Sequence, residues 1–559
     1  MKGNQQKLFY ILIGLIALVN CLQAAFTELI YDEAYYWYFS SQLDWGYFDH
    51  PPMVAGMMAL GNLVFKGTLA VRIIGVLMSV GTYILLWETI KDTRKYSFVW
   101  SFIVLVFSMT LLNAYGFFSL PDTPLLFFTA LFIFLLQAFY NKANWILSLA
   151  LGLVMAALMY SKYHAVLVIV GVVFGNPKLL KNRYAWGSVL VSLLAYSPHL
   201  YWLYKNEFVS VAYHLFERPN RAYDFFDFGL GYWVNLIAIF GLTFPFIYKT
   251  LFSVKANTTL KKSMIGIVLT VLVFFLVSSF NRRIQTQWIV VICIPVAYLV
   301  FERLIEDKKL RKQLWITGLI NIVLIVFLRL GLIFEPLLPI SYEAHGNKEW
   351  VAALEKKVGL AKVVFEDSYR NAPMYAFYSR ATTYSLNSIS YRENQYNIDG
   401  SEESIQGEKV AYITKEDIQS DFSFQKAKNT VYYGRWIDHF QSYSLLETKL
   451  LEISAGVIYF KLTNPYKNTI ALQDLDFGVA FLNSYKQYKN LTPIYFSKEE
   501  EKKMNTKSLA PGASILIKGA VKKPTSYDES GYFKITIASA GLPYLLGGTN
   551  QKIARWKPF

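Results

Sequence analysis

Long apolar runs recur through the first 340 residues of this 559-residue chain, and they limit its fold more than any other feature. A membrane-spanning helix needs about 20 largely apolar residues, because the hydrocarbon core of a bilayer is about 30 Å thick. Apolar runs of this length or somewhat shorter occupy residues 8–26, 68–90, 97–115, 121–140, 145–160, 163–175, 185–204, 229–249, 264–280, 284–301 and 313–333. The sequence therefore predicts a polytopic α-helical membrane protein with about eleven spans.

Charge divides the chain into two parts. Charged residues make up 43 of the first 341 residues but 51 of the last 218, whereas soluble proteins contain about 25%. This contrast excludes a single soluble enzyme, a coiled coil and a disordered regulator. We expect a transmembrane domain over residues 1–341, followed by an α/β domain at 342–450 and a β-rich domain at 451–559.

Several function classes are excluded by what the sequence lacks. The net charge of +16 lies largely between apolar runs, as in membrane proteins, and does not indicate nucleic-acid binding. Cys21 and Cys293 both lie within apolar runs, which argues against a disulfide framework. No nucleotide-binding loop and no His-Glu-x-x-His motif is present. The apolar start behind Lys2 and Lys7 resembles a signal peptide, but ten further runs favour a first span.

The positions of Lys and Arg predict the orientation. With a cytoplasmic N-terminus, every second loop is basic, and we expect these loops in the cytoplasm. They carry Lys91, Arg94, Lys95, Lys142, Lys178, Lys181, Arg183, Lys255, Lys261, Lys262, Arg303, Lys308, Lys309, Arg311 and Lys312. Eleven crossings then place the C-terminal domains outside the cytoplasm.

Ionisable residues gather on the expected outer side. They are Asp32, Glu33, Asp44, Asp49, His50, Asp122, Lys162, His214, Glu217, Arg218, Arg221, Arg282 and Arg283. Each could simply be a solvated span end, but charges near membrane depth are costly and often mark function. A carboxylate can accept a proton from a hydroxyl, and cations can neutralise a departing phosphate. This combination favours group transfer from a lipid-linked phosphate donor. A transporter would place its carboxylates nearer the midplane.

An aromatic string follows the acidic pair. It comprises Tyr35, Tyr36, Trp37, Tyr38, Trp45, Tyr47 and Phe48. The preferred interpretation is an interfacial belt on a short helix along the membrane surface. The alternative is that some of these rings stack on a sugar.

The stretch YDEAYYWYFSSQLDWGYFDHPPM (Tyr31–Met53) resembles the first outer loop of family 39 glycosyltransferases of the GT-C superfamily. That family includes protein O-mannosyltransferases and the bacterial aminoarabinose lipid A transferase. The resemblance continues through Ser119–Phe128, Met159–Leu167, Phe208–Arg221, Glu366–Arg380 and Arg392–Asp399. It implies a polyprenyl-phosphate-sugar donor, transfer outside the cytoplasm, and inversion at the anomeric carbon.

The resemblance also implies residue roles. Asp32 matches the family's catalytic carboxylate, the expected general base, and Glu33 matches its acidic neighbour, which orients Asp32 or the acceptor. Asp122 matches the second acid of the family motif. The residues implied to bind the donor phosphate are Lys162, Arg218, Arg221 and His50.

The resemblance leaves a divalent metal as an expectation. Asp49 and His214 fall where the lipid A transferase uses a carboxylate and a His to hold one. That transferase has Lys-Pro-Pro where this chain has His50-Pro51-Pro52. Because His is charged only part of the time near neutral pH, this departure weakens lipid A as the acceptor and leaves the metal open.

The C-terminal residues predict mixed structure. Lys362–Asp367 has the pattern of a buried strand, and Glu349–Val358 has an apolar face at helical spacing. Apolar segments at 456–462, 512–521 and 532–541 predict a small β-sandwich, and Glu499–Lys503 is expected to be a solvated loop. We expect these domains to cap the site and select the acceptor.

Together these features predict a glycosyltransferase of the bacterial inner membrane. Its expected partners are a polyprenyl-phosphate-linked sugar and an acceptor that is lipid A, another glycan or a protein, with no nucleotide cofactor and no nucleic acid. The alternative is a lipid or polysaccharide transporter that forms no glycosidic bond. A degenerate binding protein is a third reading, which the intact acidic pair opposes.

Overall fold

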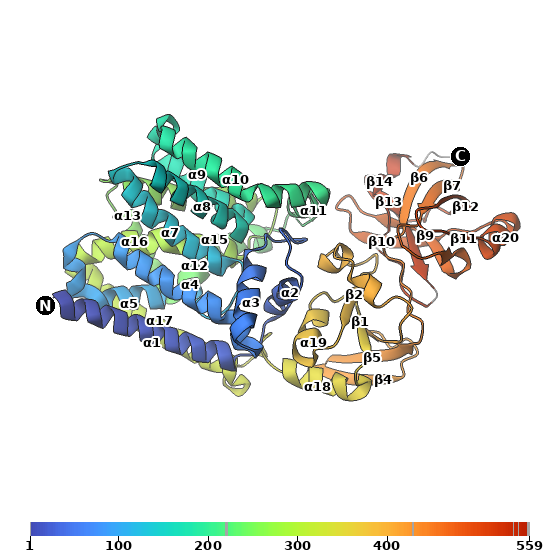
Figure 1. Ribbon diagram of the computed structural model, residues 1–559, viewed down its shortest axis with the longest axis horizontal. Helices are drawn as coiled ribbons and strands as arrows, with labels where there is room; N and C mark the ends of the chain where they lie inside the picture. The colour runs from blue at the N-terminus through green and yellow to red at the C-terminus, as the bar shows by residue number, and fades with distance from the viewer. Residues whose placement is uncertain (1, 219–221, 428–429, 540, 546, 556–559) are drawn as a thin grey trace. The chain divides into compact units, whose positions relative to one another are not determined.

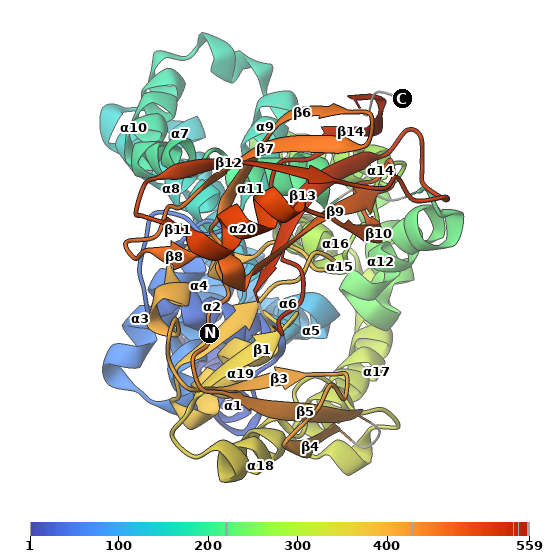
Figure 2. The ribbon, with the colours of Figure 1, turned by 90° about the vertical axis from the view of Figure 1, so that its right-hand side faces the viewer.

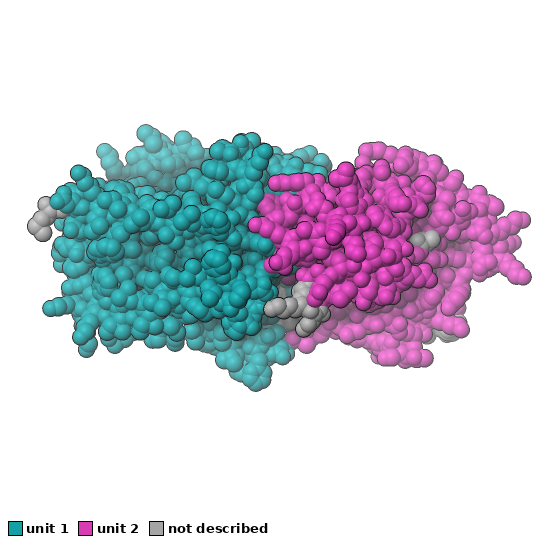
Figure 3. Space-filling model, turned by 90° about the horizontal axis from the view of Figure 1, so that it is seen from below, with its two compact units in different colours: residues 1–219, 223–345 teal, residues 220–222, 346–559 magenta. Residues whose placement is uncertain are grey.

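The computed structural model describes residues 2–218, 222–427, 430–539, 541–545 and 547–555. The chain divides into two compact units (Figure 3). Unit 1 comprises residues 1–219 and 223–345, and unit 2 comprises residues 220–222 and 346–559. The named elements of unit 1 are all helices, whereas unit 2 contains the sheets (Figure 1).

Seven helical segments among the described residues are long and apolar enough to cross a membrane. They are α1 (Lys2–Phe26), α4 (Gly67–Thr89), α7 (Asp122–Asn141), α14 (Thr259–Ser278), α17 (Lys308–Ile333) and the composite segments Phe225–Phe252 and Thr286–Glu306. The composite segments contain α12 (Gly231–Phe240), α13 (Phe244–Phe252), α15 (Thr286–Ile289) and α16 (Cys293–Glu306). The other helices are α2 (Tyr31–Ser40), α3 (Met53–Val64), α5 (Val99–Ser108), α6 (Thr110–Ala114), α8 (Trp145–Ser161), α9 (Val166–Gly175), α10 (Arg183–Lys205) and α11 (Val209–Ala212).

Each predicted apolar run is mostly helical, which confirms the polytopic α-helical fold class. The core of unit 1 is built around α16, in which every residue from Cys293 to Phe301 is buried. Helices α4, α5, α7, α13, α14 and α17 pack against it. Among the candidate spans, the one that contains α16 is the most buried, and α16 therefore lies at the centre of the bundle.

Two predicted continuous spans are broken, and one side chain of α17 supports both breaks. Helix α5 ends at Ser108 before α6 starts, and α12 ends at Phe240, before Gly241 with φ +56°. The Asn321 amide donates to the backbone carbonyls of Ser108 (2.6 Å) and Phe240 (3.2 Å). Its Oδ1 accepts from the backbone N–H of Leu242 at 3.0 Å. Backbone groups freed inside a membrane need such partners, so the breaks are stable.

The first part of unit 2 is an α/β layer. Its five-stranded sheet has the order β2-β1-β3-β5-β4, with β1 parallel to β2 and β3 and the remaining pairs antiparallel. The strands are β1 (Lys362–Glu366), β2 (Thr383–Leu386), β3 (Val410–Thr414), β4 (Phe422–Ala427) and β5 (Thr430–Ile437), and the helices are α18 (Asn347–Val358) and α19 (Asn371–Ser379). The predicted helix and buried strand are both confirmed.

The rest of unit 2 is a β-sandwich, as predicted. One sheet has the order β10-β9-β13-β14 and the other β12-β7-β6, with a short β11-β8 pair (Figure 2). The strands are β6 (Glu447–Ser454), β7 (Val457–Thr463), β8 (Ile470–Ala471), β9 (Leu475–Leu482), β10 (Tyr488–Pro493), β11 (Ser508–Leu509), β12 (Ser514–Ala520), β13 (Tyr532–Ser539) and β14 (Gln551–Lys552). Inward-facing residues of both sheets, such as Phe460 and Val479, form its core.

One expectation for this region is wrong. Glu499–Lys503 is not a loop but lies in helix α20 (Lys498–Thr506). The Ser497 hydroxyl accepts a hydrogen bond from the backbone N–H of Glu500 and caps the helix. Three glutamates in the first turn interact favourably with the positive end of the helix dipole. The Ser-x-x-Glu pattern of Ser497 and Glu500 is typical of a helix start. It was overlooked because the run of charged residues was interpreted as a solvated loop.

Candidate active site

Helix α2 carries Asp32 and Glu33 in its first turn. The Glu33 carboxylate accepts a hydrogen bond from the backbone N–H of Ile30 at 3.3 Å, which ties down the start of the helix. Negative side chains here also interact favourably with the helix dipole. The two acids have different surroundings, because Glu33 is 0% exposed and Asp32 is half-buried. Only Asp32 is accessible to a substrate.

Arg72 of α4 holds Glu33 in place. Its Nε donates to Oε1 of Glu33 at 2.8 Å and its Nη2 to Oε2 at 2.5 Å. Its other guanidinium N–H groups donate to the backbone carbonyls of Ala24, Thr27 and Glu28, at 3.0, 2.6 and 2.9 Å. The backbone N–H of Ser119 also donates to Glu33, at 2.9 Å. The pair therefore joins α4, the end of α1, the start of α2 and the turn before α7. Glu33 is thus held by Arg72 and the Ser119 N–H and is shielded from solvent.

Asp122 and Lys162 form a second buried ion pair. Asp122 is the first residue of α7, and Lys162 directly follows α8. The Lys162 ammonium donates to both carboxylate oxygens of Asp122, each at 2.7 Å, and the Tyr115 hydroxyl donates to Oδ2 at 3.3 Å. Both charged side chains are less than 10% exposed. Most of the charge of Lys162 is thus balanced by Asp122.

Asp32 lies near this pair. It interacts electrostatically with both Lys162 and Tyr115. Arg218 also interacts electrostatically with Lys162. Residues separated by up to 186 positions in the chain therefore form one charged cluster, as the sequence predicts. The half-buried carboxylate of Asp32 stands beside two satisfied internal ion pairs.

The outer loop brings Asp49 and His50 to the same region. Nδ1 of His50 lies 3.0 Å from Oδ1 of Asp49, and Nε2 of His50 lies 3.3 Å from the Tyr36 hydroxyl. His214 interacts electrostatically with Asp49, His50 and Arg218. These residues, to which the resemblance gives metal or phosphate binding, therefore lie next to the charged cluster.

Asp49 and His214 offer too few ligands by themselves for a divalent metal. The described part of the chain contains no group of three or more His, Cys, Asp or Glu side chains placed to hold an ion. Nε2 of His214 lies 2.8 Å from the backbone carbonyl of Asp49, so this nitrogen carries a proton and donates. The lone pair of neutral His214 therefore lies on Nδ1, the nitrogen that could bind a metal. A metal at Asp49 and His214 would need further ligands and stays a prediction.

Burial lowers the pKa of His214 to about 4, whereas an unfolded His has a pKa of about 6.5. The unfolded state therefore binds more protons between about pH 6.5 and pH 4, so folding stability falls as the pH falls through this window. We expect a His214→Gln variant, which keeps a hydrogen-bond donor, to lose less stability there. Thermal unfolding in detergent from pH 4 to pH 7.5 measures the difference. Parallel pH profiles for variant and wild type would contradict this expectation.

Two arginines of this cluster contact only neutral hydrogen-bond and ring partners within the described part of the chain. Arg218 donates from Nη2 to Oε1 of Gln285 at 2.9 Å, and its guanidinium lies 4.8 Å from the ring centre of Trp288. Arg282 donates from Nη1 to the backbone carbonyl of His214 at 3.0 Å, and its Nε is buried without a hydrogen-bond partner. Burial, reinforced by the nearby Arg218, lowers the pKa of the Arg282 guanidinium. The neighbouring positive charges of Arg218 and Arg282 therefore favour the binding of an anion.

Arg282 was not among the residues selected for donor binding. The sequence places it on the outer side, but no motif distinguishes it from its neighbour Arg283. The structure does, because Arg282 is half-buried and Arg283 is exposed. The predicted Arg221 lies outside the described residues.

The interfacial-belt interpretation of the aromatic string is wrong for most of its members. The short helix exists as α2, but Tyr35, Tyr36, Tyr47 and Phe48 are all less than 7% exposed. Tyr47 stacks on Phe39 with ring centres 4.3 Å apart. These rings pack the outer loop onto α2 and thereby hold Asp49 and His50 in position. Trp45 alone among them is largely exposed.

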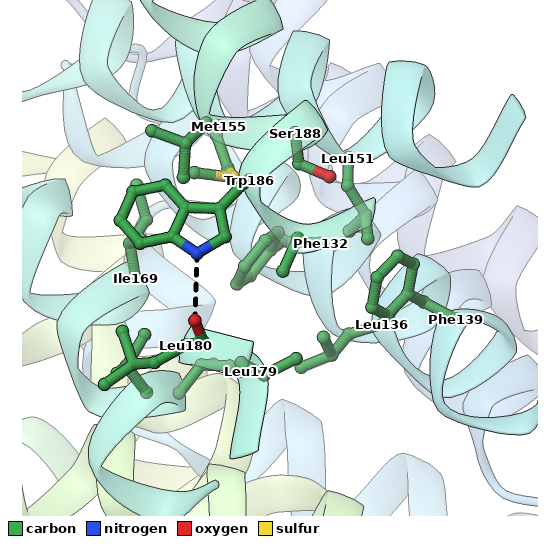
Figure 4. Close-up of a pocket in the computed structure, with 14 residues that line it drawn as sticks. Phe132, Leu136, Phe139, Leu151, Met155, Ile169, Leu179, Leu180, Trp186 and Ser188 are labelled. Carbon is green, nitrogen blue, oxygen red and sulfur yellow. Dashed lines mark hydrogen bonds between the residues drawn. The ribbon is translucent and has the colours of Figure 1, made fainter. Parts of the chain in front are cut away.

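An apolar pocket lies between α7, α8, α9 and α10 (Figure 4). Its lining includes Phe132, Leu136, Met155 and Trp186. The Trp186 indole N–H donates to the backbone carbonyl of Leu180 at 2.9 Å, so its polar atom is satisfied. With a volume of about 90 Å³ and no charged lining residue, this pocket offers no group for catalysis.

Comparison with known proteins adds independent findings. A family model described as dolichyl-phosphate-mannose-protein mannosyltransferase matches residues 49–202. The lipid A galacturonosyltransferase RgtD of Rhizobium johnstonii is 25% identical over 192 residues, which are 33% of this chain and 40% of the length of that relative. The matched region of the family model includes Asp49, His50, Asp122 and Lys162.

The fold resembles a solved membrane protein. The crystal structure of ArnT from Cupriavidus metallidurans in the apo state aligns with a TM-score of 0.56 at 12% identity. The alignment covers 77% of this chain and 98% of that one. This chain therefore shares its fold with ArnT, and over part of its length it is similar in sequence to the mannosyltransferase family model and to RgtD.

Proposed function

We propose that the protein transfers a sugar from a polyprenyl-phosphate donor to an acceptor outside the cytoplasm. The observation that carries this proposal is that one charged cluster contains a half-buried carboxylate, Asp32, and two arginines, Arg218 and Arg282, whose hydrogen-bond partners among the described residues are neutral. A base on one side and an anion site on the other are what transfer from a phosphate leaving group requires.

The proposed reaction is a single displacement with inversion. Asp32 accepts the proton of the acceptor hydroxyl, and the acceptor oxygen forms a bond to the anomeric carbon. The bond between that carbon and the phosphate oxygen breaks, and the phosphate keeps the electron pair. Arg218 and Arg282 stabilise the charge that develops on it. If the acceptor is a phosphate, which is already ionised, Asp32 only positions it.

The internal ion pairs have a different part in this proposal. Lys162 is balanced by Asp122, so we assign Lys162 to shaping the site and adding positive potential, and assign direct phosphate contact to the arginines. His50 and Asp49 line the acceptor side. His214 supports Arg282 through its backbone carbonyl.

The proposal also includes the orientation of the protein in the membrane and the class of acceptor. The basic loops favour a cytoplasmic N-terminus in the bacterial inner membrane and an extracytoplasmic site and unit 2. The similarity to a lipid A galacturonosyltransferase supports lipid A as one acceptor class, and other glycans and proteins are the alternatives.

The purified full-length chain, incubated with radiolabelled polyprenyl-phosphate sugar and candidate acceptors, tests the function. Transfer releases free polyprenyl phosphate and labels the acceptor. A transporter would instead move substrate across sealed vesicles without forming a new glycosidic bond, and that result would overturn the proposal.

The same assay tests the arginine pair. A hydrogen bond to a charged group contributes about 1.5–3 kcal/mol, so Arg282→Gln should raise the KM for the donor about 10- to 100-fold. The adjacent, exposed Arg283→Gln is the matched control and should change KM about twofold at most. Equal effects of the two substitutions would remove Arg282 from the donor site.

A further inference from the structure

The parallel strands of unit 2 end together at one edge of the five-stranded sheet, here called the carboxyl edge. Strand β1 lies between β2 and β3 and runs parallel to both, and Figure 2 shows β1 beside β3. The chain leaves β1 through α19 to β2 on one side, and then crosses back to β3 on the other side. Ligands of open α/β sheets bind outside the carboxyl ends of the strands, where the strand order reverses in this way.

Two adjacent carboxylates stand at the carboxyl edge. Glu366 is the last residue of β1, and Asp367 follows it. The Ser388 backbone N–H donates to Oδ1 of Asp367 and the Ser388 hydroxyl donates to Oδ2, each at 2.7 Å. The Tyr412 hydroxyl donates to Oε2 of Glu366 at 2.6 Å. Since a carboxylate offers about four acceptor sites, these donors leave room for the hydroxyl groups of a ligand.

The charges at this edge are of both signs. Glu366 and Asp367 are half-buried, and burial raises the pKa of both carboxyl groups, as is typical of binding sites. Lys415 interacts electrostatically with Asp367, and the Arg435 guanidinium lies 5.1 Å from the ring centre of Tyr412. The carboxylates disfavour a phosphate, and the two cations disfavour a metal ion. The edge therefore suits a neutral polar ligand.

Two tyrosine rings extend the carboxyl edge. Tyr369 comes two positions after Asp367, and Tyr391 lies in the loop after β2. Their ring centres are 6.1 Å apart, both residues are half-buried, and Tyr391 interacts electrostatically with Asp367. Ser390, beside Tyr391, is exposed. An aromatic ring packs against the apolar face of a sugar, whose hydroxyls donate to carboxylates.

We propose that the carboxyl edge of unit 2 binds a neutral saccharide. Tyr369 and Tyr391 pack against the sugar ring, and Asp367 and Ser390 form hydrogen bonds with its hydroxyls. The inference deepens the proposed function and rests on it for one point, namely that the saccharide is part of a glycan acceptor. The site then selects the acceptor and takes no part in the chemical step.

Binding of neutral trisaccharides of glucose, galactose or mannose to the purified full-length protein tests the site, by isothermal titration calorimetry. At least one of them should bind. Tyr391→Ala should weaken this binding about tenfold, the loss expected when one aromatic contact is removed. Tyr391→Phe keeps the ring and should bind within about threefold of the wild type.

Tyr485→Ala is the matched control, because Tyr485 is also a tyrosine of unit 2, 38% exposed between β9 and β10. It should leave the binding unchanged. Absence of binding to the wild type, or an equal loss in Tyr485→Ala and Tyr391→Ala, would overturn the inference. Binding of phosphorylated but not of neutral saccharides would overturn it as well.

The transfer assay tests the link to the acceptor. With an acceptor that carries the bound saccharide, Tyr391→Ala should raise the KM for the acceptor about tenfold and leave the KM for the donor unchanged. An unchanged acceptor KM would overturn the role of this saccharide as part of the acceptor. Saccharide binding without any transfer by the wild type would instead contradict the proposed function and support the binding site, which separates the two failures.

Discussion

Replacing Asp32 by Asn lowers the rate of sugar transfer about 10²- to 10⁴-fold, the range in which a positioned general base contributes. The substitution keeps the size and hydrogen-bonding capacity of the side chain but removes its ability to take the acceptor's proton. Because Arg218 and Arg282 are untouched, the KM for the donor should stay close to the wild-type value. Release of polyprenyl phosphate from the full-length protein measures both quantities.

Asp44→Asn is the matched control for this experiment. Asp44 lies in the same outer loop but is exposed, and its carboxylate accepts a hydrogen bond from the Trp202 indole at 2.8 Å, which an Asn oxygen can also accept. This variant should retain turnover. Unchanged turnover in Asp32→Asn, with thermal unfolding like that of the wild type, would show that Asp32 is not the base. If a phosphate is the acceptor, the loss instead appears in the acceptor KM.

The helical framework was predictable because apolar runs of bilayer length leave the backbone few alternatives. The breaks at Ser108 and Gly241 were not, since they depend on Asn321, which is far from Ser108 in the sequence and becomes their partner only after folding. Helix α3 was missed because its twelve residues are too short to be read as a span. Strand patterns in unit 2 gave the sandwich, since alternation reports burial directly.

The candidate site was predictable at the level of residues but less so at the level of roles. Asp32, Asp122 and Lys162 were selected because charges at span ends are costly. The sequence does not show that Lys162 forms an ion pair with Asp122, nor that Arg72 pairs with the buried Glu33. The two residues of each pair lie about 40 positions apart in the chain. The aromatic string was misassigned for the same reason. Composition alone does not separate an interfacial ring from a core ring.

The Arg72–Glu33 pair gives the prediction with the largest effect on stability. Removing one partner of a buried ion pair leaves an uncompensated charge and costs about 3–5 kcal/mol. Both Arg72→Met and Glu33→Leu should therefore lower the thermal midpoint sharply and reduce the monodisperse fraction in detergent. Stability like that of the wild type in either single variant would contradict a buried pair.

The double variant separates positioning from stability. Arg72→Met combined with Glu33→Leu removes both charges, and replacing a buried ion pair by apolar residues is often neutral or stabilising. We expect it to recover much of the stability that each single variant loses. Turnover should stay low, because the carbonyls at the end of α1 and the Ser119 N–H lose their partners and no longer hold the start of α2, which carries Asp32, in place. If turnover recovered together with stability, the pair would be a structural support alone, and the position of Asp32 would depend on the packing of the aromatic residues of α2.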